Sequence, residues 1–388
     1  MLKKWSSLVL SGALMSYAAF PSLHAFFPDS RDIPLDVKIG QMLCLDFRQW
    51  EDESGILRGV TEINDTIREI IDRYHIGSVI LFRENFLDEF QSKKLIADLQ
   101  SAAISSGNPP LIIAVDQEGG VVERFSFDRE RLKNNVDITS SAEAYEKGDV
   151  IGKELYNLGI NCDFAPVVDV HSNPKSPITK LRSFGADPER VAACGESFMR
   201  GLHENRVAAA SKHFPGHGCT EFDTHVGLPV AYKTLEELEK LELIPFDRLI
   251  KSGVDMVMTA HIALPLIASE RAISIKDGRG ISIPATLSKE ILTRILREKL
   301  GFRGVVVSDA MNMKAISENF GEGESVARAI NAGVDVVLMP VTLRNKEDIE
   351  KLKRLIGYIK GLIASGEISE ERINESVERI FKLKEKYC

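Results

Sequence analysis

Residues 304–309 read Gly-Val-Val-Val-Ser-Asp, and this short apolar run ending in a carboxylate is the pattern that decides the fold. A continuous β-branched run is typical of a strand buried on both faces of a parallel sheet. Seven other short apolar runs lie along the chain. Eight strands are therefore expected, at 40–47, 78–82, 111–116, 161–166, 207–213, 256–261, 304–309 and 334–339.

The segments between these runs carry apolar residues at helical spacing. Two clear sets are Ile63, Ile67, Ile70 and Ile71 before the second strand, and Ile291, Leu292, Ile295 and Leu296 before the seventh. Ser288 is placed to cap the second of these helices and Gly301 to end it. Strands that alternate with helices indicate a parallel sheet, and eight such units close a barrel. The sequence therefore predicts an α/β fold, a (β/α)8 barrel of the TIM type.

Two further helical patterns follow the eighth strand and are separated by Ser365 and Gly366. They predict extra C-terminal helices that pack outside the barrel. The length of 388 residues is within the range of one barrel with insertions. No repeat at solenoid spacing and no linker rich in proline, glycine or serine divides the sequence. We therefore expect a single barrel domain over residues 26–388.

Residues 1–25 differ in character from the rest. Lys3 and Lys4 precede an apolar run at 8–20, and Ala25 supplies a small residue where a signal peptidase would cleave. The run is shorter than the stretch of about 20 apolar residues that spans a bilayer. We expect a signal peptide that is removed, no stable membrane insertion, and a periplasmic or secreted protein, with a cytoplasmic location as the less favoured alternative.

The charges and cysteines exclude other classes. The formal net charge is −8, and basic residues are interleaved with acidic ones, so a nucleic-acid partner is not expected. The five cysteines have no CxxC or metal-ligand spacing and predict no disulfide framework.

Several predicted strands end in residues that can do chemistry. The third ends in Asp116, the fifth in Lys212 and His213, the sixth in His261 and the seventh in Asp309. Active sites of such barrels form at the C-terminal ends of the strands, so these side chains should share one rim. Taken from the residues alone, Asp309 fits a catalytic carboxylate and a cap of the following helix equally well.

The loop after the fifth strand concentrates further functional groups. Residues 212–218 read Lys-His-Phe-Pro-Gly-His-Gly, and Asp223-Thr224-His225 follow. A carboxylate two residues from an imidazole can orient the ring and raise its basicity, as general acid–base catalysis requires. Most Asp-x-His sequences are solvated loops, but the nearby strand end favours a catalytic role here. Arg124 and Arg182 add further hydrogen-bond donors that could contact a ligand.

Together these motifs resemble the β-N-acetylglucosaminidases of glycoside hydrolase family 3, in the single-domain branch that acts in peptidoglycan turnover. The most specific match is 212–218 followed by 223–225. Shorter matching pieces occur in order at 80–85, 116–120, 163–169, 182–185, 300–304, 308–309 and 338–340. The likeness runs from about Gly40 to Pro340 and departs at Thr224, where the family typically has serine.

The resemblance implies a role for each candidate. Asp309 is then the nucleophile, His225 the general acid/base and Asp223 the residue that orients it. The terminal sugar would be held by Asp116, Arg124, Arg182, Lys212 and His213. The implied substrate is a terminal β-linked N-acetylglucosamine of a saccharide or muropeptide. We expect no cofactor, no metal and, by default, a monomer.

Four alternatives remain open. The substrate's own acetamido oxygen could be the nucleophile, with Asp309 orienting it. Phosphate could replace water as the acceptor, because an uncharged imidazole does not repel it. A metal-dependent barrel hydrolase would draw its ligands from His213, His217, His225, His261 and Asp309, although these imidazoles lack the paired spacing of metal sites. The fourth is a non-catalytic exported sugar-binding barrel, against which the presence of the three catalytic candidates argues.

Overall fold

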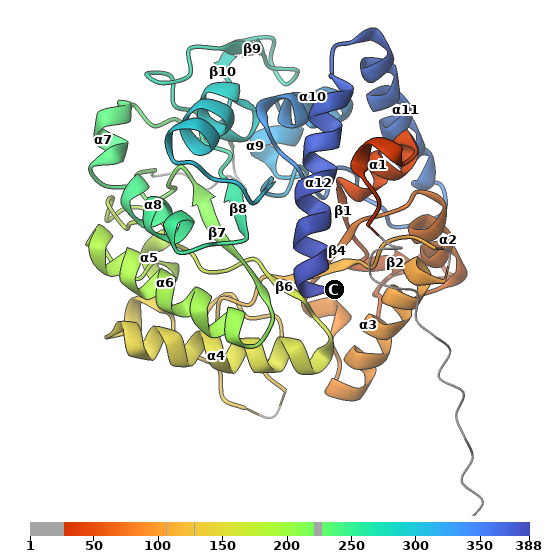
Figure 1. Cartoon of the computed structure of the whole chain (residues 1–388), viewed down its shortest axis with the longest axis horizontal. Coiled ribbons are helices and arrows are strands. Elements are labelled where there is room, and N and C mark those ends of the chain that lie inside the picture. Colours follow the sequence, from red (N-terminus) through yellow and green to blue (C-terminus); the bar gives the residue numbers. More distant parts are fainter. Residues whose placement is uncertain (1–26, 106, 128, 221–226) are drawn as a thin grey trace, which may run out of the picture.

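The computed structural model describes residues 27–105, 107–127, 129–220 and 227–388. Within them, eight parallel strands form a ring that helices surround (Figure 1). The strands are β1 (Leu43–Asp46), β4 (Ser78–Leu81), β5 (Ile112–Val115), β6 (Cys162–Asp163), β7 (Ala208–Phe214), β8 (Met256–Thr259), β11 (Val305–Val307) and β12 (Val337–Leu338). Each falls in or overlaps one of the eight predicted runs.

The strands follow one another around the ring in chain order, and β12 pairs with β1 through Leu43 and Val337. The gap between β11 and β12 is closed by a parallel bridge between Val307 and Val336. Beside it, the Ser308 N–H donates to the Val336 carbonyl over 3.0 Å. The predicted (β/α)8 TIM-type barrel is confirmed.

Helices occupy the connections between the strands. The α-helices are α1 (Leu35–Gln41), α2 (Asp65–Arg73), α3 (Glu89–Ile104), α4 (Ser141–Leu158), α5 (Thr179–Arg182), α6 (Pro188–Glu204), α7 (Leu235–Glu239), α8 (Leu243–Lys251), α9 (Lys314–Ser317), α10 (Glu322–Ala332), α11 (Ile349–Ser365) and α12 (Glu370–Tyr387). The π-helix η6 (Glu290–Lys299) joins β8 to β11, and short 3-10 turns are η2 (Ser30–Asp32), η3 (Arg83–Asn85), η4 (Asn135–Asp137) and η5 (Ala285–Leu287).

Two antiparallel hairpins lie outside the pattern that the sequence predicted. One pairs β2 (Gln49–Glu51) with β3 (Leu57–Gly59), and the other pairs β9 (Arg271–Ile273) with β10 (Gly280–Ser282). Their strands are three residues long and mostly exposed or half-buried, so they lack the apolar runs that mark the barrel strands. Both are insertions in connections that follow barrel strands.

Helices α11 and α12 are the extra C-terminal helices, and Gly366 separates them with a φ of 82°. Figure 1 shows α12 lying across the ring. Polar side chains of this helix contact residues that precede strands. Lys386 Nζ lies 2.8 Å from Asp255 Oδ1, and Arg372 Nη2 lies 2.5 Å from Asp335 Oδ1. This helix therefore covers the N-terminal ends of the strands, and the opposite end of the barrel is left for function.

Lys384 is a buried cation of this interface, and it makes stability depend on pH. Its Nζ donates to Gln41 Oε1 over 2.6 Å, and burial lowers the pKa of its ammonium group to about 7. Between that value and the unfolded pKa of about 10.4, the unfolded chain holds a proton that the folded chain lacks. The free energy of unfolding should therefore rise with pH across this window, by up to about 1.4 kcal/mol per pH unit from this group.

Urea unfolding at pH 7, 8 and 9 measures this contribution as the difference between wild type and Lys384→Met. We expect the free energy of unfolding of wild type to increase relative to that of Lys384→Met as the pH rises. Lys382→Met, at an exposed position on the same helix, is the matched control and should follow the wild-type pH profile. Parallel profiles for wild type and Lys384→Met would show that this ammonium group is not perturbed.

Two further observations concern membrane-spanning helices and the cysteines. No helix in the described ranges is both long and apolar enough to cross a membrane. All five cysteines lie in the part of the chain that the structure describes and are free thiols, with Cys44, Cys162 and Cys194 buried.

Candidate active site

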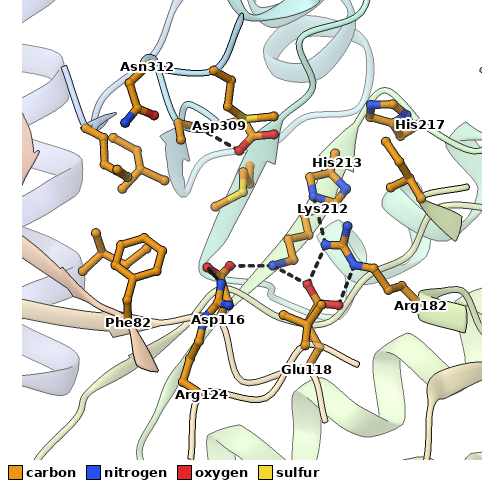
Figure 2. A pocket seen from close by; sticks show the side chains of 18 of the residues that line it. Phe82, Asp116, Glu118, Arg124, Arg182, Lys212, His213, His217, Asp309 and Asn312 are labelled. Carbon is orange, nitrogen blue, oxygen red and sulfur yellow. Dashed lines mark hydrogen bonds and ion pairs between the residues drawn. The ribbon is translucent and has the colours of Figure 1, made fainter. Parts of the chain in front are cut away.

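A cavity of about 700 Å³ opens at the C-terminal ends of the strands. Figure 2 shows its labelled side chains gathered from several strand ends around a common space. Six predicted site residues line it, namely Asp116, Arg124, Arg182, Lys212, His213 and Asp309. Asp223 and His225 lie outside the described residues. Of the strand-end residues expected to share one rim, Asp116, Lys212, His213 and Asp309 line this cavity and His261 does not.

Lys212 is the centre of an ion-pair network in this cavity. Its Nζ lies 2.7 Å from Asp116 Oδ1 and 2.7 Å from Glu118 Oε1, and its side chain is 1% exposed. Asp116 also accepts a hydrogen bond of 2.9 Å from Arg124. Glu118 accepts two from Arg182, of 2.8 and 2.6 Å. The network alternates three cations with two carboxylates and fixes all five side chains (Figure 2).

The network keeps its charges at neutral pH. Burial alone would raise the pKa of Asp116 and of Glu118, but the neighbouring cations outweigh it. They hold the pKa of Asp116 well below its usual range and lower that of Glu118 to about 2. Burial would lower the pKa of Lys212, yet Asp116 and Glu118 raise it. Fixed donors and acceptors of this kind suit sugar hydroxyls, since each hydroxyl both donates and accepts.

Asp309 follows β11 and faces the same cavity. One of its oxygens, Oδ1, accepts a 2.7 Å hydrogen bond from the Ala310 N–H. No lysine, arginine or histidine forms an ion pair with it among the residues that the structure describes. Figure 2 shows its carboxylate across the cavity from Asp116 and Lys212. Its second oxygen is thus not committed to a cation and can react with a bound molecule.

The alternative structural role for Asp309, capping the next helix, is not what the structure shows. Helix α9 begins at Lys314, its N-cap is Met313, and no side chain caps it. Asp309 lies several residues earlier, at the cavity wall. The capping interpretation of Asp309 is therefore wrong, and its functional role stays a prediction.

A buried carboxylate, Asp169, organises the loop after β7. Its Oδ2 lies 2.7 Å from His213 Nδ1, and its Oδ1 accepts from the backbone N–H groups of His213, over 3.1 Å, and His217, over 2.7 Å. Burial would raise the pKa of Asp169, but His213 and the other donors lower it. Asp169 therefore fixes the His213 ring and the backbone that leads to His217.

Gly218 lets this loop pack against the backbone that follows Asp169. A Cβ at position 218 would lie 1.7 Å from the Val170 carbonyl oxygen, so any side chain must push the two segments apart. We expect Gly218→Ala to lower the free energy of unfolding by about 2–3 kcal/mol, the usual cost of overpacking. Chemical denaturation measures this directly.

The matched control is Gly361→Ala in α11, where a Cβ would meet nothing within 4 Å. There alanine should stabilise the helix by about 0.5–1 kcal/mol. A Gly218→Ala variant as stable as wild type would refute the close packing of the two segments.

Several polar and aromatic residues at the cavity were not predicted as site residues. Arg48, Phe82, Glu118 and His217 line the cavity, and Asp169 contacts His213 and His217 beside it. Glu118 and Asp169 lie inside matched motifs, two residues after Asp116 and at the end of 163–169, so their position after a strand was a usable signal. The Arg48 guanidinium lies over the Phe82 ring, 3.5 Å from its centroid. No local sequence pattern predicts this contact.

His261, which the sequence places at the end of the sixth strand, does not line this cavity. Its Nδ1 lies 2.8 Å from Thr286 Oγ1 and its Nε2 3.1 Å from the Ala310 carbonyl oxygen. In the described ranges, no group of three or more histidine, cysteine or acidic residues is arranged to hold a metal ion.

Comparison with known proteins gives the family. The model of the "Glycosyl hydrolase family 3 N terminal domain" matches residues 34–383. The chain belongs to glycoside hydrolase family 3. The family resemblance on which the motifs were interpreted is thereby confirmed.

Relatives of known name place the chain within family 3. It is 39% identical over 364 residues to beta-hexosaminidase A of Pseudoalteromonas piscicida, covering 90% of this chain and 60% of that one. It is 34% identical over 283 residues to a beta-hexosaminidase of Tolumonas auensis, covering 71% and 79%. The structure of a family 3 beta-N-acetylglucosaminidase from Paenibacillus sp. str. FPU-7 superposes with a TM-score of 0.81 at 38% identity, covering 92% of this chain and 63% of that one. The chain thus spans less than two thirds of the first and third of these proteins.

Proposed function

We propose that this family 3 chain is a retaining β-N-acetylglucosaminidase that removes a terminal, non-reducing β-linked N-acetylglucosamine. The observation that carries the proposal is the Asp309 carboxylate, which faces the charged cavity with one oxygen free of any described cation. The names of the relatives, beta-hexosaminidase and beta-N-acetylglucosaminidase, support the choice of sugar.

In the first step, an Asp309 oxygen attacks the anomeric carbon while the bond from that carbon to the leaving oxygen breaks. His225, oriented by Asp223, gives the leaving oxygen its proton. These two roles come from the family resemblance, since both residues lie outside the described part of the chain. Imidazole starts nearer to neutrality than a carboxylic acid does, so it can act as acid and then as base.

In the second step, a water oxygen bonds to the same carbon and the ester bond to Asp309 breaks. The proton from water goes to His225, which restores the enzyme. Two displacements on one carbon retain the β configuration. Asp116, Arg124, Arg182, Lys212 and His213 are proposed to hold the sugar, and Glu118 belongs to the same network.

A panel of chromogenic β-glycosides of N-acetylglucosamine, glucose and xylose tests the sugar assignment. We expect kcat/KM to be at least about tenfold higher for the N-acetylglucosaminide. A preference for glucose or xylose would overturn the assignment but leave the family intact. Binding of N-acetylglucosamine without turnover of any substrate would favour the non-catalytic alternative.

Two controls address the remaining alternatives of chemistry. Full activity after exhaustive chelation excludes a metal-dependent hydrolase. Product analysis in phosphate buffer distinguishes the acceptors, because phosphorolysis yields a sugar 1-phosphate and hydrolysis yields the free sugar. We propose hydrolysis, and a dominant 1-phosphate product would contradict it.

We further propose that the natural substrates are peptidoglycan fragments and that the protein acts on them outside the cytoplasm. We propose that it works as a monomer with a single domain over residues 26–388. The support is the family branch that the motifs resemble and the signal-like residues 1–25. N-terminal sequencing of the native protein should find a start after Ala25. A native protein that begins at Met1 would contradict the removal of residues 1–25.

A further inference from the structure

His217 is a cavity residue to which the proposed mechanism gives no task. Its side chain lines the cavity, yet the residue is only 1% exposed. The ring nitrogen Nε2 is enclosed and has no hydrogen-bond partner among the described residues. Buried polar atoms of folded proteins almost always have a hydrogen-bond partner. A buried polar atom without a partner in the wall of a binding cavity therefore indicates a ligand.

The His217 ring is held in one orientation. Its backbone N–H donates to Asp169 Oδ1 over 2.7 Å, and its Nδ1 lies 2.8 Å from Thr220 Oγ1. Its ring meets that of His213 edge-on, with centroids 6.0 Å apart and planes at 79°. Figure 2 shows the two imidazoles side by side at the edge of the cavity. Since Nδ1 is engaged inside the loop, Nε2 is the nitrogen left for the cavity.

The charge state of the ring decides which groups Nε2 can bind. Burial lowers the pKa of the His217 imidazole, although the Asp169 carboxylate opposes this. The ring is then neutral at neutral pH and presents either a lone pair or an N–H at Nε2. A hydroxyl can form a hydrogen bond with either form, because it can both donate and accept. A carboxylate can only accept and an ammonium group can only donate, so each can bond to only one of the two forms.

We propose that His217 Nε2 is a direct ligand of a ring hydroxyl of the terminal sugar. The proposal deepens the proposed function and rests on it. His213 and His217 then form a pair of neighbouring imidazoles in the sugar site, with Asp169 fixing the loop that carries both. His217 acts as a specificity residue, because a sugar without that hydroxyl leaves Nε2 buried and unpaired.

The test crosses two variants with a panel of chromogenic N-acetylglucosaminides that lack the 3-, 4- or 6-hydroxyl. His217→Phe keeps the ring size and removes the nitrogen, whereas His217→Gln keeps a polar atom near the position of Nε2. For wild type, we expect loss of one particular hydroxyl to lower kcat/KM by about 10–100-fold. His217→Phe should lose a similar factor on the parent substrate and nothing further on that deoxy substrate, and His217→Gln should recover part of the loss.

An equal factor lost by His217→Phe on every substrate would overturn the proposal, since it is the signature of a purely structural role. If wild type hydrolyses none of the panel, the proposed function fails. The binding affinities of wild type and both variants are then measured by calorimetry with free N-acetylglucosamine and its deoxy analogues. A loss of affinity in His217→Phe that disappears for one deoxy sugar supports the ligand role. An equal loss for every sugar, or no loss, refutes it.

Discussion

Asp309→Ala is expected to lower kcat/KM on an N-acetylglucosaminide by at least about 10³-fold while the protein stays folded, because it removes the nucleophile. The carboxylate forms no ion pair with a described residue, so its loss leaves no cation unpaired. Steady-state kinetics and a thermal melt of the same preparation separate lost chemistry from lost structure. The melting temperature should stay close to that of wild type.

Two controls sharpen this prediction. Asn312→Ala changes an exposed residue that lines the cavity on the same loop and should cost less than about tenfold. Azide added to Asp309→Ala should restore turnover and give the α-glycosyl azide, because a small anion can occupy the space of the lost carboxylate. A variant that keeps a tenth or more of the wild-type rate would show that Asp309 is not the nucleophile.

Lys212→Met carries the second large expected effect. Removing this cation leaves Asp116 and Glu118 without the charge that lies 2.7 Å from both of them. Breaking a buried ion pair from one side costs about 3–5 kcal/mol of stability, because an uncompensated charge remains. We expect that loss in denaturant unfolding, together with a fall in kcat/KM of at least about 10²-fold, since the sugar site loses its fixed geometry.

The matched control for Lys212→Met is Lys314→Met. Lys314 lines the same cavity but is exposed, so its loss should change stability by no more than about 0.5 kcal/mol. Equal losses of stability and activity in the two variants would contradict the conclusion that Lys212 holds the ion-pair network together. A stable Lys212→Met variant with full activity would do the same.

Much of the barrel can be predicted from the sequence, because its signals are local. Each of the eight parallel strands is buried on both faces, and a run such as Val305 to Val307 shows this directly. Parallel strands present their C-terminal ends at one rim, so the residues that end them can be grouped without knowing any contact. Asp116, Lys212, His213 and Asp309 were found in this way.

The contacts between distant segments could not be predicted from such patterns. Arg48 stacks on Phe82, and α12 closes the far end of the ring with Lys384 and its neighbours; neither contact follows a periodicity. Glu118 was not predicted, although it lies two residues after Asp116 in a matched motif. His217 was considered only as a possible metal ligand. That its Nε2 lacks a hydrogen-bond partner can be known only from the folded structure.

The central claim is that Asp309 bonds to the sugar, and mass spectrometry of a trapped intermediate tests it most directly. A 5-fluoro-N-acetylglucosaminyl fluoride slows the second step and keeps the acetamido group, so both the covalent and the substrate-assisted routes stay open to it. We expect one adduct with the mass of the fluorosugar, on the peptide that contains Asp309. An adduct on another residue, or turnover of the reagent with no adduct at all, would contradict it.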